Sequence, residues 1–232
     1  DEVDRRQVDK PRGAMTMHGL TIRKGAGAPR MSGLTTLRRG GPVLAEVCLT
    51  GAEAVPYLPE IASGLGGTLM CLGAGSNVLA GEGPLPLVIV RDASRPDIDI
   101  LEDDGARVLV RAGASVKLPI LLGRLKSLNL GGLEGLTGIP GTVGGAVAMN
   151  AGSYGQCIAD ALASVSVVTL DGAVRVIPVE EIDCGYRHMS LPGLPDWHMV
   201  IAATFSVNRK EPGFGAAAAR AAMAREKASP PV

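Results

Sequence analysis

Aromatic residues are scarce in this chain: they make up 3% of its 232 residues. Proteins that hold single-stranded nucleic acid stack its bases on aromatic rings, so this class is disfavoured. The formal net charge is zero and no basic stripe stands out, which argues against nucleic-acid partners and anionic membrane surfaces. No apolar run is long enough to cross a bilayer, and no signal peptide is visible. We therefore expect a cytoplasmic protein with neither kind of partner.

Cysteine and histidine are few, and their spacing predicts neither a disulfide framework nor a metal site. No C-x-x-C pair occurs among the four cysteines, which are Cys48, Cys71, Cys157 and Cys184. We interpret them as buried or free thiols in a reducing compartment. The three histidines are expected on the surface or in loops, so no metal is assigned: His18, His188 and His198.

Glycine, by contrast, is abundant, with 32 residues. Hydrophobic residues make up 46% of the chain and charged residues 20%, which is typical of a globular protein. Because glycine costs backbone entropy on folding, so many glycines indicate loops that need a positive φ angle or that approach a ligand through the backbone. The glycines gather in a few places, which favours close approach there.

Apolar periodicity predicts both strands and helices. Strands are expected at 43–49, 68–72, 87–90 and 199–207, the second and third of them buried. Helical spacing over 55–65 is restricted by two prolines. A second helix is expected over 115–128, with Ser115 as its N-cap and leucines on one face. Alanine-rich residues 216–228 favour a third.

Two Asp-Gly pairs between β-branched runs predict hairpins, because such tight turns need positive φ angles. One hairpin joins 98–101 to 106–110 and the other joins 165–170 to 173–177. Hairpins, crossovers and helices together indicate an α+β, or mixed α/β, architecture. A boundary near 91–96 divides a smaller N-terminal lobe from a larger one. The polar, aperiodic start of the chain favours a tag remnant or a disordered tail.

The first motif that suggests chemistry is the run from Leu72 to Leu79, LGAGSNVL. A strand ends there, two glycines expose backbone N–H groups, and Ser76 and Asn77 add side-chain donors. Such a nest suits a phosphate or pyrophosphate. It lacks the third glycine of G-x-G-x-x-G, so it does not predict a Rossmann site. A plain tight turn is the alternative.

The second motif is longer and more specific: GGLEGLTGIPGTVGGAVAMNAGSYG, from Gly131 to Gly155. A flexible linker is the simplest alternative, but a linker would not interleave so many large apolar residues. A packed loop that offers backbone donors to a large planar or anionic ligand fits better. Asn150 and Ser153 could add polar contacts.

A third motif, Cys184-Gly185-Tyr186-Arg187, follows the acidic segment at 180–183. Pairing of Arg187 with those surface carboxylates is the alternative to a functional role.

Four blocks together resemble the UDP-N-acetylenolpyruvoylglucosamine reductase family. Residues 35–42 are similar to its T-T-F-R-x-G-G-P opening, and residues 73–77 to its G-G-G-S-N phosphate loop. Residues 132–155 resemble its G-L-E-x-L-x-G-I-P-G-T-V-G-G-A-V-x-M-N-A-G-A-Y-G signature, and 185–187 its G-Y-R motif. The blocks occur in family order and cover about 34–207.

The resemblance implies a vanillyl-alcohol-oxidase-type (PCMH-like) fold, in which two lobes hold non-covalent FAD and a third, C-terminal domain covers the substrate. It implies that NADPH reduces the flavin, which passes a hydride to the enolpyruvyl group of a UDP-sugar in peptidoglycan precursor synthesis. A serine of the third domain donates the proton, and an arginine and a glutamate stabilise the enol-like intermediate.

The resemblance also implies roles for individual residues. The cofactor's pyrophosphate is expected at Gly73, Ala74, Gly75, Ser76 and Asn77. The adenine-ribose and flavin side is expected at Thr137, Gly138, Pro140, Gly141, Gly144, Gly145 and Ala146. Tyr186 and Arg187 match substrate-binding residues, and Arg187 is the expected catalytic residue. A guanidinium aimed at a carboxylate-conjugated alkene stabilises charge that develops during hydride addition.

The chain departs from the family pattern in several places. One extra residue separates Arg187 from Ser190, the following loop lacks the usual F-K, and Leu37 replaces a phenylalanine. The chain also stops before the family's P-S-A-G-S-x-F-K-N-P motif, so the serine and the distal glutamate have no counterpart here. The expected organisation is a tail at 1–30, an N-terminal FAD-binding lobe at 31–95, a second lobe at 96–210, and a C-terminal helix or tail at 211–232 that leads to a missing substrate domain.

Three interpretations stay open at this point. The chain is a reductase without its substrate domain, or a catalytically incomplete FAD-binding module that depends on a partner. The third interpretation is another FAD oxidoreductase of the same superfamily, and the extended match over 131–155 favours the reductase over it.

Overall fold

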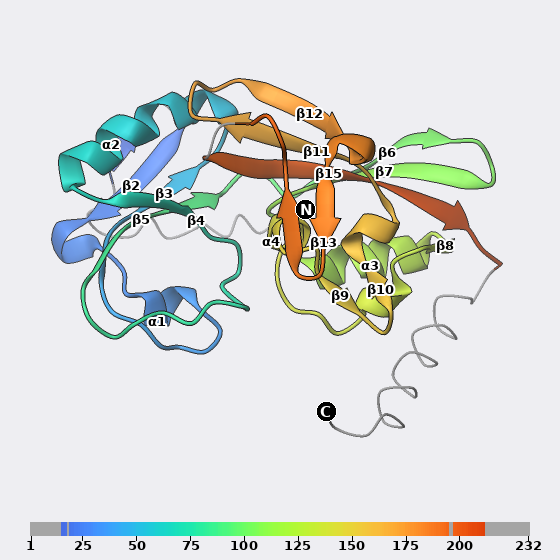
Figure 1. Ribbon diagram of the computed structural model, residues 1–232, viewed down its shortest axis with the longest axis horizontal. Helices are drawn as coiled ribbons and strands as arrows, with labels where there is room; N and C mark the ends of the chain where they lie inside the picture. Colours follow the sequence, from blue (N-terminus) through green and yellow to red (C-terminus); the bar gives the residue numbers. More distant parts are fainter. Residues whose placement is uncertain (1–14, 18, 195–196, 212–232) are drawn as a thin grey trace, which may run out of the picture.

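In the computed structural model, which describes residues 15–211 except 18, 195 and 196, two β-sheets lie next to each other (Figure 1). The first sheet has the strand order β1-β2-β3-β5-β4. Its strands are β1 (Met15–Met17), β2 (Leu20–Lys24), β3 (Val43–Leu49), β4 (Thr68–Cys71) and β5 (Leu85–Asp92). Strands β3, β4 and β5 run parallel, whereas β1 and β2 pair antiparallel. The expected helix at 216–228 lies outside the described residues.

The connection from β3 to β4 shows how proline shapes a helix. It begins as the 3-10 helix η2 (Ala52–Tyr57) and continues as α2 (Leu58–Leu65). Pro56 lies in the 3-10 turn, and Pro59 lies in the first turn of α2, where a missing N–H is tolerated. Gly66 ends α2 with a φ angle of +65°. The predicted helical spacing is confirmed, but its first part forms a tighter helix.

Two predictions about the first sheet are wrong. Residues 68–72 do not form a buried strand, because β4 is the edge strand and its Thr68 and Cys71 are exposed. The expected tail does not extend to residue 30, since β2 pairs with β3 and buries Leu20 and Ile22. The predicted strand at 87–90 is confirmed as the buried middle of β5.

The second sheet is antiparallel, in the order β12-β11-β15-β7-β6, with β8 pairing β15 as well. Its strands are β6 (Ile98–Asp103), β7 (Arg107–Gly113), β8 (Leu130–Gly131), β11 (Leu162–Thr169), β12 (Val174–Pro178) and β15 (His198–Arg209). Both predicted hairpins are confirmed, with Gly105 at φ +90° and Gly172 at φ +80°. Backbone N–H groups of Arg107 and Ala106 bond to the Asp104 carboxylate in the first turn and lower its pKa.

Helices α3 (Leu118–Ser127) and α4 (Val143–Ala148) pack below the second sheet (Figure 1). Leu118, Leu121 and Leu125 are buried and belong to the same hydrophobic core as Phe205 of β15. The amphipathic helix is therefore confirmed. Ser115 is not its N-cap: that position is Lys117, and the Ser115 hydroxyl donates instead to the Ser94 carbonyl at 3.3 Å.

Shorter elements complete the fold. They are η1 (Gly25–Gly27), α1 (Met31–Leu34), η3 (Glu134–Leu136), β9 (Gly152–Ser153), β10 (Gln156–Cys157), η4 (Ile158–Asp160), η5 (Val179–Glu181), β13 (Asp183–Gly185) and β14 (His188–Ser190). Among the helices of the described chain, none combines the length and apolarity needed to span a membrane.

The two sheets meet through a shared core. Val168 of β11 and Met199 of β15 pack among the buried residues of the first sheet, next to Val88 and Val90. The carboxyl ends of β4 and β5 therefore face the beginning of β15, and this junction positions the site described below.

Candidate active site

A groove of about 290 Å³ lies where the two sheets meet, and we call it the interlobe groove. The first lobe contributes Cys71, Leu72, Gly73, Ala74, Val90, Arg91 and Asp92. The second contributes Ala114, Ser115, Lys117, Thr142, Gly144, Gly145, Ala148, His198, Met199 and Val200. Both glycine-rich motifs that the sequence singles out therefore reach one groove from different lobes.

The first glycine loop is held in place by close backbone packing. Gly75 has a φ angle of +64°, and a Cβ atom there would lie 2.3 Å from the Leu34 carbonyl oxygen. The carbonyl of Gly75 accepts a hydrogen bond from Thr36 N at 3.1 Å, which ties the loop to the 35–42 motif. Of the expected pyrophosphate residues, Gly73 and Ala74 line the groove, whereas Asn77 is exposed beyond it.

The second glycine-rich segment is packed and crosses the first. Its Leu133, Leu136, Val143 and Val147 are buried, so the flexible-linker alternative is wrong. The Ser76 hydroxyl of the first loop donates to the Pro140 carbonyl at 3.1 Å. Gly141, at φ +129°, would bring a Cβ atom to 3.1 Å from the same hydroxyl. The expected cofactor residues of the two motifs thus meet at this crossing.

Gly144 and Gly145 are adjacent but differ in what surrounds them. A Cβ atom on Gly144 would lie 2.8 Å from the Cβ atom of Ala114, so packing within the protein requires this glycine. Within the described chain, the one atom that a Cβ atom on Gly145 would meet beyond the adjacent residues and the backbone of α4 is Thr142 Oγ1, at 3.5 Å, an ordinary contact. Gly145 is exposed and lines the groove. Its missing side chain therefore leaves room for a ligand.

Other expected cofactor residues lie farther from the groove. The Thr137 hydroxyl donates to the Glu134 carbonyl at 2.7 Å, and Gly138 is exposed. The side chain of Ala146 packs in the core of the second lobe, and its N–H bonds to the Thr142 carbonyl. Contacts of these three residues with a cofactor stay predictions.

The groove also holds charged residues that sequence reasoning missed, Arg91 and Asp92 at the end of β5. Asp92 Oδ1 accepts hydrogen bonds from the N–H and the hydroxyl of Ser94. Asp92 Oδ2 is buried and has no hydrogen-bond partner within the described residues. A buried carboxylate oxygen without a partner is costly, so it suits a donor group of a ligand. The sequence signal that could have pointed to Arg91 and Asp92 was the pair of charges directly after the apolar run Leu87–Val90.

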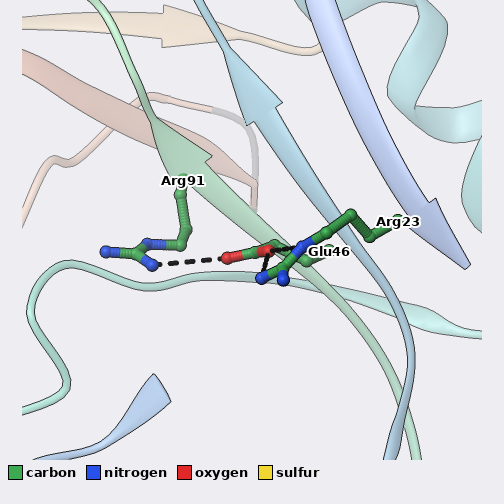
Figure 2. A network of polar contacts seen from close by, with 3 residues as sticks. All are labelled: Arg23, Glu46 and Arg91. Atoms are coloured by element: carbon green, nitrogen blue, oxygen red, sulfur yellow. Dashed lines mark hydrogen bonds and ion pairs between the residues drawn. The ribbon is translucent and has the colours of Figure 1, made fainter. Parts of the chain in front are cut away.

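Arg91 belongs to an ionic network around a buried carboxylate, shown in Figure 2. Glu46, in the middle of β3, has a side chain only 2% exposed and lies between two arginines. Arg23 Nε bonds to Glu46 Oε2 at 2.6 Å, and Arg23 Nη2 also contacts that oxygen. Arg91 Nη1 bonds to Glu46 Oε1 at 3.3 Å. In the sequence, the signal for this network was a single acidic residue within an otherwise apolar strand.

Tyr186 and Arg187 form the two-residue turn between β13 and β14 and line a second cavity, of about 540 Å³. Arg187 has a φ angle of +54° and its guanidinium lies 5.4 Å from the centre of the Tyr186 ring. A positive φ angle is unfavourable for arginine, and such strain is often found at functional sites. Within the described chain Arg187 makes no ion pair with the acidic segment at 180–183.

Asn150 connects this second cavity to the glycine-rich segment. It is 7% exposed, its Nδ2 donates to the Gly185 carbonyl at 3.0 Å, and its Oδ1 accepts from Ala159 N at 3.0 Å. The two cavities have no lining residue in common. Helix α4 links them, since Ala148 lines the groove and Asn150 lines the cavity with Arg187.

Comparisons with known proteins agree with this arrangement. A family model described as an FAD binding domain matches residues 43–177. UDP-N-acetylenolpyruvoylglucosamine reductase of Nitratidesulfovibrio vulgaris is 45% identical over 204 residues, which are 88% of this chain and 69% of the relative. The reductase of Oleidesulfovibrio alaskensis is 45% identical over 183 residues, 78% of this chain and 61% of the relative. The chain thus spans about two thirds of the length of these relatives.

Solved structures show the same fold. The crystal structure of the reductase from Thermus caldophilus superposes with a TM-score of 0.70 at 29% identity, covering 88% of this chain and 70% of that one. Physcomitrella patens BBE-like 1 superposes with a TM-score of 0.60 at 17% identity, over 83% and 43% of the two chains. The expected vanillyl-alcohol-oxidase-type (PCMH-like) α+β fold is confirmed. With its two glycine-rich motifs facing one groove and relatives at 45% identity, the chain belongs to the UDP-N-acetylenolpyruvoylglucosamine reductase family of FAD-binding proteins.

Proposed function

We propose that this chain binds FAD in the interlobe groove and serves the reduction of UDP-N-acetylglucosamine enolpyruvate to UDP-N-acetylmuramate, with NADPH as the reductant. The observation that carries the proposal is the meeting of Gly73 and Ala74 with Gly144 and Gly145 at one groove between the lobes. The 45% identity to reductases of this name supports the same substrate. We further propose that the protein acts in the cytoplasm, in peptidoglycan precursor synthesis.

The groove fits a large ligand that carries both anionic and donor groups. Gly145 leaves open space where a side chain would stand, and the buried Asp92 Oδ2 lacks a partner within the described chain. Backbone N–H groups of a glycine loop suit a pyrophosphate. When bound, FAD supplies the hydride acceptor and donor between NADPH and the enolpyruvyl double bond. In this proposal the first sheet, with β2 included, and the second sheet are the two cofactor-binding lobes, with their boundary near residue 95.

Arg187 has the proposed role of substrate activation. Its guanidinium is exposed on a turn that Asn150 fixes to the end of the glycine-rich segment. A positive charge held there can attract the substrate carboxylate and stabilise the negative charge that develops next to it during reduction. Tyr186, itself 91% exposed, holds its ring 5.4 Å from the guanidinium, a cation–π distance. Because the chain spans about two thirds of the length of its reductase relatives, turnover is best measured with the chain fused to the C-terminal third of one of them.

An absorption experiment tests the proposal. The purified chain is titrated with FAD, then given NADPH, and finally the enolpyruvyl UDP-sugar. We expect a protein-bound flavin band that NADPH bleaches. Recovery of the band with substrate is expected after the C-terminal third of the Nitratidesulfovibrio vulgaris reductase has been fused to the chain. A chain that binds no FAD would refute the proposal. A fused chain that NADPH bleaches but substrate never reoxidises would refute the assigned substrate.

A further inference from the structure

The network around Glu46 holds more positive charge than it needs. Arg23 places both Nε and Nη2 on Glu46 Oε2, so this arginine alone neutralises the buried carboxylate. Arg91 adds a second guanidinium to the other carboxylate oxygen. Two positive groups and one negative group leave one positive charge over. Arg91 satisfies the second oxygen of the buried carboxylate, but its positive charge is not needed to neutralise Glu46.

The excess charge lies at the interlobe groove. Arg91 lines the groove with a side chain 37% exposed, whereas Arg23 is not among the lining residues. Its hydrogen bond to Glu46 uses one N–H of Nη1, and the guanidinium has four further N–H donors in its plane that can bond to a ligand. Asp92, the next residue, also lines the groove, and its Oδ1 accepts hydrogen bonds from Ser94.

Arg91 also lies next to the first glycine loop. Leu72 N donates to the Val90 carbonyl at 2.9 Å, so the chain segment that opens into Gly73 and Ala74 runs beside the end of β5. An anionic group seated on those glycine N–H groups would have the guanidinium within the same groove. Arginine binds phosphate oxygens through paired N–H donors.

We propose that Arg91 is a further cofactor-binding residue, which contacts the diphosphate bridge of FAD, and that Glu46 is the positioning residue that holds its guanidinium toward the groove. This inference rests on the proposed function, since it needs FAD in the groove. In Figure 2 Glu46 lies between the two arginines, and of the two only Arg91 lines the groove.

The test compares Arg91→Gln with Arg23→Gln, measuring FAD affinity by fluorescence titration and stability by thermal unfolding of the 232-residue chain. Each variant leaves Glu46 with one arginine, so both should unfold at a lower temperature than the wild type. Loss of a charge-assisted hydrogen bond to the ligand should weaken FAD binding about 10- to 100-fold in Arg91→Gln. Arg23→Gln should bind FAD nearly as the wild type does.

Two further readouts separate a ligand contact from a structural role. Raising the salt concentration should weaken FAD binding to the wild type more than to Arg91→Gln, because salt screens the guanidinium–phosphate attraction. Arg91→Lys, which keeps the charge but loses the planar fork, should recover part of the affinity. Equal FAD affinities in the two glutamine variants, or equal salt dependence, would overturn the role of Arg91 while leaving the proposed function intact. A wild-type chain without FAD affinity would overturn both.

Discussion

Substitution of Gly145 separates an effect on folding stability from an effect on FAD binding most clearly. It lies inside α4, where glycine costs about 0.5–1 kcal/mol relative to alanine. Among the described residues, and apart from the two adjacent residues and the backbone of α4, a new methyl group would meet Thr142 Oγ1 alone within 4 Å, at 3.5 Å. Gly145→Ala should therefore leave the free energy of unfolding unchanged or raise it by up to about 1 kcal/mol.

The same methyl group projects into the interlobe groove, where we propose that the cofactor lies against the backbone. A ligand already in van der Waals contact with the glycine must move away or lose its neighbouring hydrogen bonds. We expect FAD affinity to fall at least tenfold, which corresponds to about 1.4 kcal/mol. Gly145→Val adds two more carbon atoms in the same direction and should bind still more weakly.

Gly144→Ala is the matched control for this test. Its methyl group would lie 2.8 Å from the Cβ atom of Ala114, so the backbone must shift. Overpacking of this kind costs about 1–3 kcal/mol of stability. Two measurements should therefore separate the variants. In thermal unfolding Gly145→Ala should be as stable as the wild type and Gly144→Ala less stable, and in fluorescence titration Gly145→Ala should bind FAD weakly. Wild-type FAD affinity in Gly145→Ala would refute the placement of the cofactor at α4.

Three other changes test the rest of the site and one of the turns. Arg187→Ala, in the chain fused to the substrate domain, should lower turnover about 10²- to 10³-fold, the loss typical of one group that stabilises developing charge. FAD affinity should not change. Normal turnover would contradict the assigned role. Asn150→Ala removes two buried hydrogen bonds, to the β13–β14 hairpin and to Ala159, and should cost about 1–3 kcal/mol of stability by chemical denaturation; an unchanged midpoint would contradict it. The Asp171 carboxylate accepts hydrogen bonds from the Thr169 hydroxyl and from Ala173 N, which lower its pKa. Its stabilising effect is therefore present above the unfolded pKa and lost as pH falls through the folded pKa, so Asp171→Asn should flatten the acid side of the unfolding-temperature profile.

Local chemistry explains which parts of the fold were predictable. The hairpin turns at Gly105 and Gly172 and the strand from Val43 to Leu49 were found because their signals lie within a few residues. The burial of β4 was predicted wrongly because its apolar run does not tell whether a strand is central or at the edge. That depends on the order β3-β5-β4, which is set by contacts far apart in the sequence.

The predictions for the start of the chain and for the N-cap of α3 were wrong for related reasons. Residues 20–24 are too few to show a period, yet pairing with β3 makes them a strand. Ser115 has the right type for an N-cap, but the loop from β7 directs its hydroxyl to Ser94. In both cases tertiary contacts outweighed a weak local preference.

The candidate site was predictable at the level of motifs but not of single residues. Glycine content located both loops, whereas the sequence could not say that Gly144 serves packing and Gly145 leaves space in the groove. Arg91 and Asp92 lie in no motif, because they reach the groove only through the position of β5 between β3 and β4. Residues that reach a site from the end of a strand are identified from the strand order of the sheet rather than from a sequence motif.

The separation of the two cavities has a consequence for mechanism. The groove is formed by strand ends and glycine backbone, which suits binding of a cofactor without side-chain rearrangement. Arg187 lies on a separate turn, and its connection to the groove runs through Asn150 and α4. A change at Gly145 should therefore alter cofactor affinity without moving the arginine, and a change at Arg187 should alter turnover with the cofactor in place. If both variants lost both properties, the two cavities would act as one site, and Asn150 would be the residue that couples them.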